Sequence, residues 1–292
     1  MGGGITNAKS EISRISVFLK NFIEDHGFSG AVIGVSGGID SAVVLAILSR
    51  TLPKSKIRAL ILPERDSNPT SSKHAKLVCS KYGVDCEEID ITPILKSLGT
   101  YSLQPPAKLI PYHIKEKYVM KKWKKYGSTY ELDIQGKADE EFRRGVAYYR
   151  SKHRVRMCKL YLEAERLGYT VVGTTNRTEW LTGFYVKWGD DATDAEPLLH
   201  LYKTEVFELA RELDVPKEIL EKPPSPDLIP GVTDEMALGM KYEEIDEILK
   251  AMDEGKDLSD FDREKVERVR KLLELGKKRN IRMVSLEREA DV

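Results

Sequence analysis

The sequence of 292 residues lacks the features that mark secreted and membrane-spanning proteins. It has only three cysteines, Cys79, Cys86 and Cys158, which form no Cys-x-x-Cys pair and so offer neither a disulfide framework nor a zinc site. No apolar run approaches the roughly 18 residues of a membrane-spanning helix, and the first residues lack a secretory signal pattern. These absences predict a cytosolic protein.

The chain also lacks net charge. Lys+Arg and Asp+Glu number 47 each, so the field of the whole molecule gives no reason to expect a nucleic acid or a membrane as partner. Hydrophobic residues make up 41% of the sequence, enough to bury one sizeable core or a core with a small appendage. We therefore expect residues 1–292 to form a single globular domain.

Strand and helix patterns alternate along most of the chain. We expect strands at 31–33, 57–62, 84–91 and 169–173, and helices at 12–27, 42–48, 74–82, 154–167 and 262–275. This order is typical of a doubly wound α/β fold, in which a parallel sheet carries helices on both faces. Ligands of such folds bind beyond the carboxyl ends of the strands.

The stretch from about Gly99 to Arg150 interrupts the alternation. It interleaves aromatic residues with a run of lysines, namely Lys115, Lys117, Lys121, Lys122, Lys124 and Lys125. Such a run can bind nucleic acid through phosphates and stacked bases. Because the chain is neutral and the run is short, we interpret it as a helical or irregular insertion with solvated lysines, and we expect no nucleic acid partner.

The most informative segment is Gly34-Val35-Ser36-Gly37-Gly38-Ile39-Asp40-Ser41, between a strand pattern and a helix pattern. Its adjacent glycines can take positive φ and let backbone N–H groups converge on an anion, while the helix start adds unpaired donors. Its two serines add hydroxyl donors. The loop has no lysine, and Asp40 can meet a phosphate only through a divalent cation. We therefore expect it to hold a departing pyrophosphate.

A second segment, Gly173-Thr174-Thr175-Asn176-Arg177-Thr178-Glu179, follows another strand and starts another helix. If Asp40 and Glu179 meet across the crevice at the end of the sheet, their oxygens can hold Mg²⁺ against a triphosphate. The alternative is that the first segment is a turn that binds nothing and that Glu179 only caps its helix.

The Ser-Gly-Gly-x-Asp-Ser loop resembles the pyrophosphate loop of ATP pyrophosphatases. Five further segments resemble those of NAD synthetases in order, spacing and residue identity. They are Arg154-Val155-Arg156-Met157, which is an Arg-x-Arg-Met motif, Gly173-Thr174, Gly183 to Asp194, Leu201 to Val206 and Glu221 to Leu228. The resemblance covers roughly residues 8–95 and 150–250.

This resemblance implies the adenine nucleotide alpha hydrolase-like fold and an AMP-forming ligase. Such an enzyme adenylates the nicotinate carboxylate of deamido-NAD with ATP, and ammonia then displaces AMP to give NAD. A glutamine-dependent enzyme would need a further amidase domain, for which this chain has no room. The implied source of ammonia is therefore the solution or a partner.

Matching positions imply roles for individual residues. ATP would be held by Gly34 to Ser41, Thr174, Lys203 and Ser225. Asp40 and Glu179 would bind Mg²⁺, and this ion, Lys203 and backbone donors would neutralise the charge that grows on the leaving pyrophosphate. Deamido-NAD would contact Arg154, Lys187, Asp194 and Lys278. In the family these substrate contacts form near a two-fold interface, which implies a homodimer.

Four departures from the family pattern lie on or near the acceptor side. Tyr149-Arg150-Ser151-Lys152-His153 replaces a segment with a small residue and asparagine, Asp191-Ala192 replaces a glycine pair, Lys277 replaces a histidine, and the insertion is long. A related acid therefore stays open as acceptor. The sequence is also compatible with another adenylating enzyme, such as one that modifies tRNA, and with a non-catalytic ATP sensor. We further expect residues 225–239 to form a mobile loop over ATP.

Overall fold

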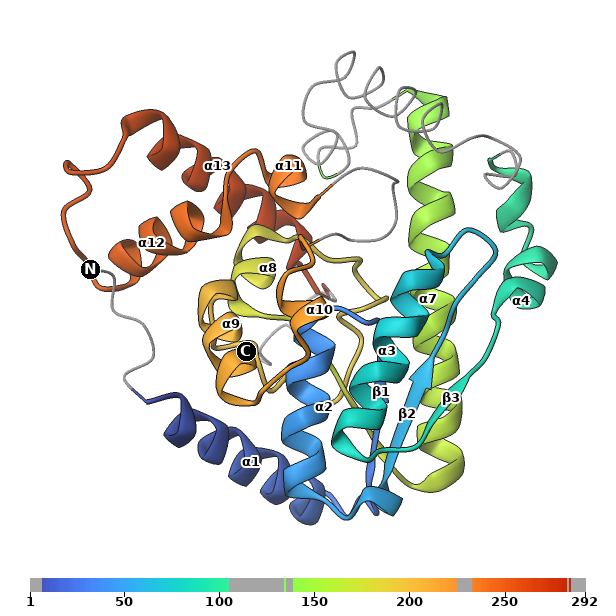
Figure 1. Cartoon of the computed structure of the whole chain (residues 1–292). Helices are drawn as coiled ribbons and strands as arrows, with labels where there is room; N and C mark the ends of the chain where they lie inside the picture. The colour runs from blue at the N-terminus through green and yellow to red at the C-terminus, as the bar shows by residue number, and fades with distance from the viewer. Residues whose placement is uncertain (1–6, 105–133, 135–138, 225–232, 283, 285–292) are drawn as a thin grey trace, which may run out of the picture.

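The structure is a computed structural model that describes residues 7–104, 134, 139–224, 233–282 and 284. At its centre lies a four-stranded sheet with the order β3-β2-β1-β4 (Figure 1). The strands are β1 (Ala31–Gly34), β2 (Ile57–Ile61), β3 (Cys86–Glu88) and β4 (Thr170–Val172). All three neighbouring pairs are parallel, which confirms the predicted sheet.

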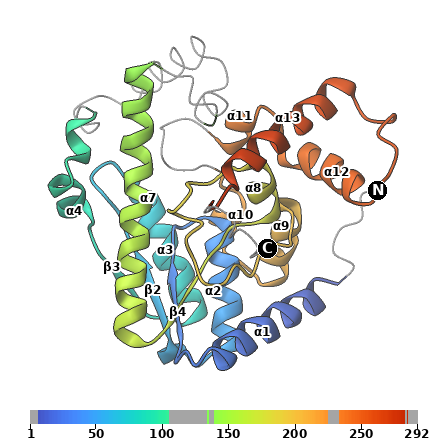
Figure 2. The same cartoon turned by 180° about the vertical axis from the view of Figure 1, so that it is seen from behind.

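Helices cover both faces of this sheet, as a doubly wound fold requires (Figures 1 and 2). One face carries α1 (Ala8–Asp25), α2 (Ile39–Thr51), α3 (Pro69–Tyr82) and α9 (Lys203–Glu212). The other carries α4 (Thr92–Ser97) and the long α7 (Glu140–Leu167). Two short 3₁₀ segments, at 54–56 and 100–102, complete this half of the molecule.

Side chains of successive strand residues enter two different cores, because they point to opposite faces of a sheet. Ala31 and Ile33 pack in the core formed with α1, α2 and α9, whereas Val32 packs against α7. The strands are therefore apolar on both faces, which is the pattern of a buried parallel sheet.

A third core lies beside the carboxyl-terminal helices. These are α8 (Arg177–Thr182), α11 (Asp234–Leu238), α12 (Tyr242–Asp253) and α13 (Arg263–Arg279), whereas the short α10 (Lys217–Leu220) packs in the core with α1, α2 and α9. Leucines and valines of α13 and isoleucines of α12 fill this core. Helix α13 also packs against α8, so the last helix supports the segment that follows β4.

Several predicted boundaries differ from the structure, among them those of α7 and β3. Helix α7 begins at Glu140 rather than at 154, because Asp139 caps it by accepting a hydrogen bond from the Phe142 N–H at 2.9 Å. Residues 140–150 of the predicted insertion thus belong to α7. Strand β3 is shorter than predicted, since it is an edge strand that pairs on one side only. The lysine-rich run at 115–125 lies outside the described residues.

The sheet order brings the carboxyl ends of β1 and β4 side by side, with Ile33 opposite Val172. The glycine loop leaves β1 at this point, and Thr174 leaves β4. Since the chain crosses from one face of the sheet to the other here, a crevice is expected between the two loops. Among the residues that the structure describes, no helix is long and apolar enough to cross a membrane.

Replacement of Gly276 by alanine is expected to destabilise the packing of α13 on α8. A Cβ atom at this glycine would lie 1.9 Å from the carbonyl oxygen of Leu181, and neither backbone can move freely. We expect Gly276→Ala to lower the free energy of unfolding by about 1–3 kcal/mol in urea titrations followed by circular dichroism.

The matched control is Gly145→Ala, in the interior of α7. Its nearest side-chain atom would be 3.6 Å away, so a methyl group fits, and alanine favours the helix by about 1 kcal/mol. Equal urea midpoints for the two variants would contradict the close approach of α13 to α8.

Candidate active site

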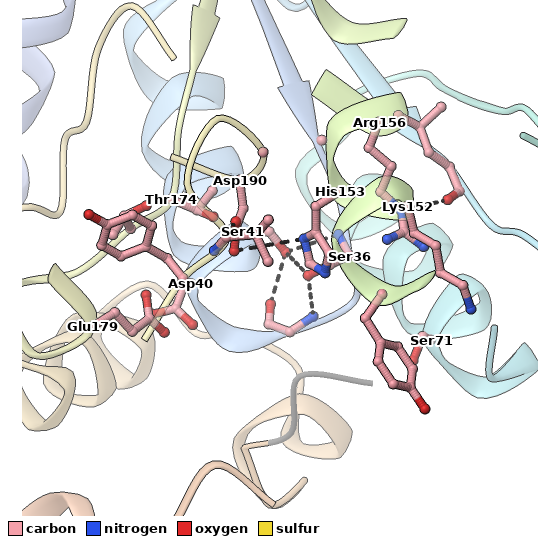
Figure 3. A pocket seen from close by; sticks show the side chains of 18 of the residues that line it. Ser36, Asp40, Ser41, Ser71, Lys152, His153, Arg156, Thr174, Glu179 and Asp190 are labelled. Carbon is pink, nitrogen blue, oxygen red and sulfur yellow. Dashed lines mark hydrogen bonds and ion pairs between the residues drawn. The ribbon is translucent and has the colours of Figure 1, made fainter. Parts of the chain in front are cut away.

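A hollow of about 590 Å³ opens at the carboxyl ends of β1 and β4 (Figure 3). It is lined by the glycine loop, by Thr174, and by side chains of α7, α8 and α9. Except for Gly37, the residues from Gly34 to Ser41 belong to this lining. The structure therefore places the loop that follows β1 and the loop that follows β4 around one space.

Two serines give the glycine loop its shape. The Ser36 hydroxyl accepts a hydrogen bond from the Gly38 N–H at 3.2 Å and lies 3.1 Å from the Ser41 hydroxyl. Ser41 in turn donates to the Gly38 carbonyl at 3.1 Å. Gly38 has no side chain with which to cap α2, so the first turn of that helix is left to a bound anion.

Of the two glycines that can take positive φ, only Gly37 adopts it. Gly37 has φ +78°, and a Cβ there would lie 2.3 Å from the Ser71 carbonyl oxygen, so both conformation and space require glycine. Gly38 is extended, with φ −95°, since it is the residue that precedes α2.

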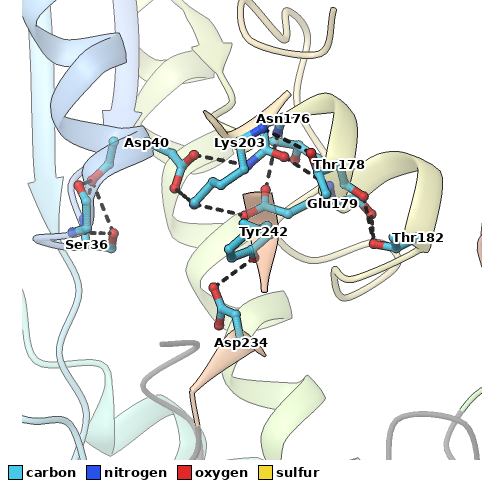
Figure 4. A network of polar contacts seen from close by, with 12 residues as sticks. Ser36, Asp40, Asn176, Thr178, Glu179, Thr182, Lys203, Asp234 and Tyr242 are labelled. Carbon is cyan, nitrogen blue, oxygen red and sulfur yellow. Dashed lines mark hydrogen bonds and ion pairs between the residues drawn. The ribbon is translucent and has the colours of Figure 1, made fainter. Parts of the chain in front are cut away.

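The Lys203 ammonium joins the two acids predicted to bind a metal. Its side chain is only 2% exposed, and Nζ lies 2.5 Å from Asp40 Oδ2 and 3.5 Å from Glu179 Oε1 (Figure 4). Asp40 comes from α2, Glu179 from α8 and Lys203 from α9. Three helices that are distant in sequence thus converge on one charge.

Glu179 also caps its own helix. The Asn176 side chain accepts from the Glu179 N–H at 3.0 Å, and Glu179 Oε2 accepts from the Asn176 N–H at 3.2 Å, which is a capping box. Asn176 further donates to Asp40 Oδ1 at 3.1 Å. Glu179 can therefore cap its helix and bind a cation at the same time, since Oε2 accepts the capping hydrogen bond and Oε1 faces Lys203.

A third acid, Asp234 at the start of α11, lies near this cluster and had no assigned role from the sequence. Tyr242 fixes it by donating its hydroxyl hydrogen to Asp234 Oδ2 at 3.0 Å. Burial acts to lower the pKa of Lys203, but Asp40, Glu179 and Asp234 together raise it above its usual value. Burial raises the pKa of Glu179 to about 8, and the neighbouring acids add to the effect.

The donor set fits a divalent cation. Asp40 and Glu179 already share one positive charge in this structure, and with Asp234 the acids outnumber the ammonium. Carboxylate oxygens combined with phosphate oxygens and water are the ligands that Mg²⁺ prefers. Within the described ranges no group of three or more His, Cys, Asp or Glu side chains is placed to hold a metal ion, so a nucleotide would have to supply ligands.

The residues that the resemblance assigns to deamido-NAD lie outside the described lining of the hollow. Arg154 is exposed on α7 and donates to the Lys187 carbonyl at 3.2 Å. The Lys187 ammonium is hydrogen-bonded to the Ile281 carbonyl. Asp194 is exposed and accepts from the Val171 N–H at 2.8 Å.

Lys278 is exposed on α13, whereas its neighbour Arg279 is buried and lines the hollow. Helical periodicity could have identified Arg279, because it lies four residues after buried Leu275. Ser225, assigned to ATP, lies outside the described residues, as does most of the loop expected at 225–239. The end of that expected loop is helical, as α11.

The hollow also contains charged groups of α7 that were not assigned a role. Lys152 is buried and donates to Glu64 at 2.9 Å, and Arg156 donates to the Leu62 carbonyl at 3.0 Å. Both line the hollow beyond β2. Arg156 belongs to the Arg-x-Arg-Met motif, but only the fold shows which of the two arginines faces inward.

Glu196 ties the loop after β4 to the segment that leads to α9. Its carboxyl group accepts from the Thr175 N–H at 2.8 Å and from the Thr193 hydroxyl at 2.8 Å. It lies so close to Gly173 that a Cβ there would be 2.1 Å from Glu196 Oε1. Burial raises the pKa of Glu196 to about 8.

This shift predicts a pH-dependent stability. Because the folded pKa of about 8 exceeds the usual 4.5, Glu196 stabilises the fold fully below about pH 4.5 and loses that contribution as pH rises through 8. Glu196→Gln cannot titrate. Urea unfolding between pH 5 and 9 should therefore show the stability of the variant increasing with pH relative to the unsubstituted protein. A constant difference across this range would contradict the shift.

Comparisons with known proteins agree with this geometry. The NAD synthase family matches residues 11–281. The NH3-dependent NAD+ synthetase of Thermotoga maritima is 56% identical over 262 residues, which cover 89% of this chain and 93% of that protein. The solved NMN synthetase of Francisella tularensis has a TM-score of 0.73 and 28% identity, and covers 96% of this chain and 99% of its own.

A solved NH3-dependent NAD synthetase from Campylobacter jejuni, in complex with the nitrate ion, superposes with a TM-score of 0.71 at 22% identity. It covers 97% of this chain and 100% of its own, and at this identity it supports the fold alone. The family match extends over most of the chain and includes both loops of the hollow. The chain therefore belongs to the NAD synthase family.

Proposed function

We propose that this chain converts deamido-NAD, ATP and ammonia into NAD, AMP and pyrophosphate in the hollow between β1 and β4. As a member of its family it is a ligase that forms a carbon–nitrogen bond and uses ATP as co-substrate. The observation that carries the proposal is the Lys203 ammonium held between Asp40 and Glu179 beside the glycine loop. We further propose one catalytic domain and a cytoplasmic location, where both nucleotides occur.

In the first step, the nicotinate carboxylate attacks the α-phosphate of ATP. Two anions approach each other, so the site must neutralise charge that grows on the leaving pyrophosphate. The N–H groups of the glycine loop and the first turn of α2 would bind the outer phosphates. Lys203 would move its hydrogen bond from Asp40 to a phosphate oxygen.

Asp40 and Glu179 would then hold Mg²⁺ against the same phosphates. The metal supplies Lewis-acid stabilisation of the phosphoryl oxygens. No protein nucleophile is needed, because holding both substrates in reactive geometry can contribute about 7–11 kcal/mol. Thr174 would contact ATP from the β4 side of the hollow, and Ser225 would do so from the segment beyond Pro224.

In the second step, ammonia attacks the acyl adenylate and displaces AMP. The product amide is NAD.

Mass spectrometry of a reaction with deamido-NAD, ATP, Mg²⁺ and an ammonium salt should show NAD, AMP and pyrophosphate in equal amounts. Because one structural relative is named an NMN synthetase, a parallel reaction contains the corresponding mononucleotide acid in place of deamido-NAD. Failure to form NAD, with NMN formed instead, would change the acceptor but keep the reaction class.

Two other functions give different results in the same assay. An enzyme that modifies tRNA would show ATP–pyrophosphate exchange stimulated by tRNA and not by deamido-NAD. A non-catalytic sensor would bind ATP and release no product. The paired acids around Lys203 argue against the sensor, since simple nucleotide binding does not require two carboxylates facing one cation.

Removal of either metal-binding acid should abolish most of the turnover. We expect Asp40→Asn and Glu179→Gln each to lower the NAD-forming rate by about 100-fold or more, because metal stabilisation is worth several kcal/mol. Circular dichroism should show an intact fold, and Asp85→Asn, at an exposed site, is the control. Normal turnover in both variants would refute the metal assignment.

We also propose that the active form is a homodimer. Arg154 and Asp194 are exposed outside the hollow of their own chain, although the resemblance assigns them to the acceptor. On α7, Arg154, Cys158 and Leu162 recur every four residues and form one exposed stripe. Leu162 is 57% exposed there. A partner that covers this stripe would bring these residues to the acceptor site.

Introduction of a charge on this stripe should separate the subunits. Leu162→Glu is expected to sediment as a monomer in sedimentation velocity and to lose most of its NAD-forming activity. Leu77→Glu, on α3 and 38% exposed, is the matched control and should behave as the unsubstituted protein does. A dimer that persists in Leu162→Glu would place the interface elsewhere.

A further inference from the structure

His153 stands out among the residues of the hollow because the mechanism above does not use it. It lies on α7 within the segment that departs from the family pattern, and its side chain lines the hollow (Figure 3). Its Nε2 atom is buried and has no hydrogen-bond partner among the side chains and backbone that the structure describes. A buried polar atom without a partner is costly unless a ligand supplies one.

The other ring nitrogen of His153 lies near a carboxyl group. Nδ1 lies 3.8 Å from Asp190 Oδ2, the contact drawn as a dashed line in Figure 3. Asp190 is itself positioned, because its Oδ1 accepts from the Val186 N–H at 2.7 Å. Burial raises the pKa of Asp190 to about 7, and in its ionised form this carboxyl group favours the proton on Nδ1 by its charge, which leaves a lone pair on Nε2.

The surroundings keep the ring neutral. Burial lowers the pKa of His153 to about 3, and the positive charges of Arg156, Lys152 and Arg154 add to the effect. The backbone packs closely as well, since a Cβ on Gly189 would lie 2.8 Å from the His153 Cβ. The His153 Cβ is therefore held against the Gly189 backbone at the edge of the hollow.

We infer that Nε2 of His153 accepts a hydrogen bond from ammonia and orients its lone pair toward the acyl adenylate. This inference rests on the proposed function. Ammonia offers three N–H donors and one lone pair, so it needs acceptors on the protein to aim that lone pair at a carbon atom. A neutral imidazole provides such an acceptor, whereas the arginine and lysine side chains nearby can only donate.

The step balances without a further reagent. The nitrogen lone pair forms the C–N bond with the carbonyl carbon, and the C–O bond to the phosphate of AMP breaks with its electron pair staying on the phosphate oxygen. The nitrogen sheds one proton, and the departing phosphate of AMP gains one. His153 contributes the direction of attack and not the net proton transfer.

The test separates the two half-reactions. Deamido-NAD-dependent ATP–pyrophosphate exchange reports adenylation, and NAD formation at limiting ammonium reports the attack of ammonia. We expect His153→Leu, which keeps the Cβ contact with Gly189, to lower kcat/KM for ammonium by about tenfold. The rate of ATP–pyrophosphate exchange should change less than twofold in this variant. His153→Gln retains an acceptor near the Nε2 position and should recover most of the loss.

His26→Ala, at the exposed end of α1, is the control for removal of an imidazole and should change neither rate. Equal losses in exchange and in NAD formation for both His153 variants would show a structural role and overturn the inference. Unchanged kcat/KM for ammonium in His153→Leu would overturn it as well. Absence of exchange in the unsubstituted protein would instead overturn the proposed function, and this inference with it.

Discussion

The arrangement of the hollow depends on a buried positive charge, the ammonium of Lys203. A lysine whose side chain is only 2% exposed is stable in its charged form only when it is paired, because the interior solvates a charge poorly. Asp40 and Glu179 provide that pairing from two other helices. The ion pairs of this one lysine thus connect α2, α8 and α9. A site that binds a metal ion and a polyphosphate also requires carboxylates for the cation and an ammonium group for the phosphates, close together.

Several groups of the site serve local structure and ligand binding together. Glu179 caps α8 with one oxygen and faces Lys203 with the other. Ser36 and Ser41 close the glycine loop, and Glu196 fastens the loop after β4. The site is therefore largely formed before a nucleotide enters, which reduces the ordering that binding must bring about.

The nucleotide side and the acceptor side differ in construction. The nucleotide side consists of strand ends and helix starts of one chain, close to the buried sheet. The acceptor side depends on α7, where His153 faces inward and Arg154, one residue later, faces outward. This split follows from the helix itself, since adjacent residues are about 100° apart around its axis.

Local patterns in the sequence were sufficient to predict the parallel sheet, the order of its helices and the glycine loop, because apolar periodicity and glycine placement are properties of short segments. The predicted residues Asp40, Glu179 and Lys203 lie together in the structure. Three relations emerged from the packed helices alone: Arg279 rather than Lys278 enters the hollow, Asp234 lies near Lys203, and His153 faces Asp190. The rotation of each helix about its axis and its contacts with distant segments set these relations, and helical periodicity gives a local signal only for Arg279.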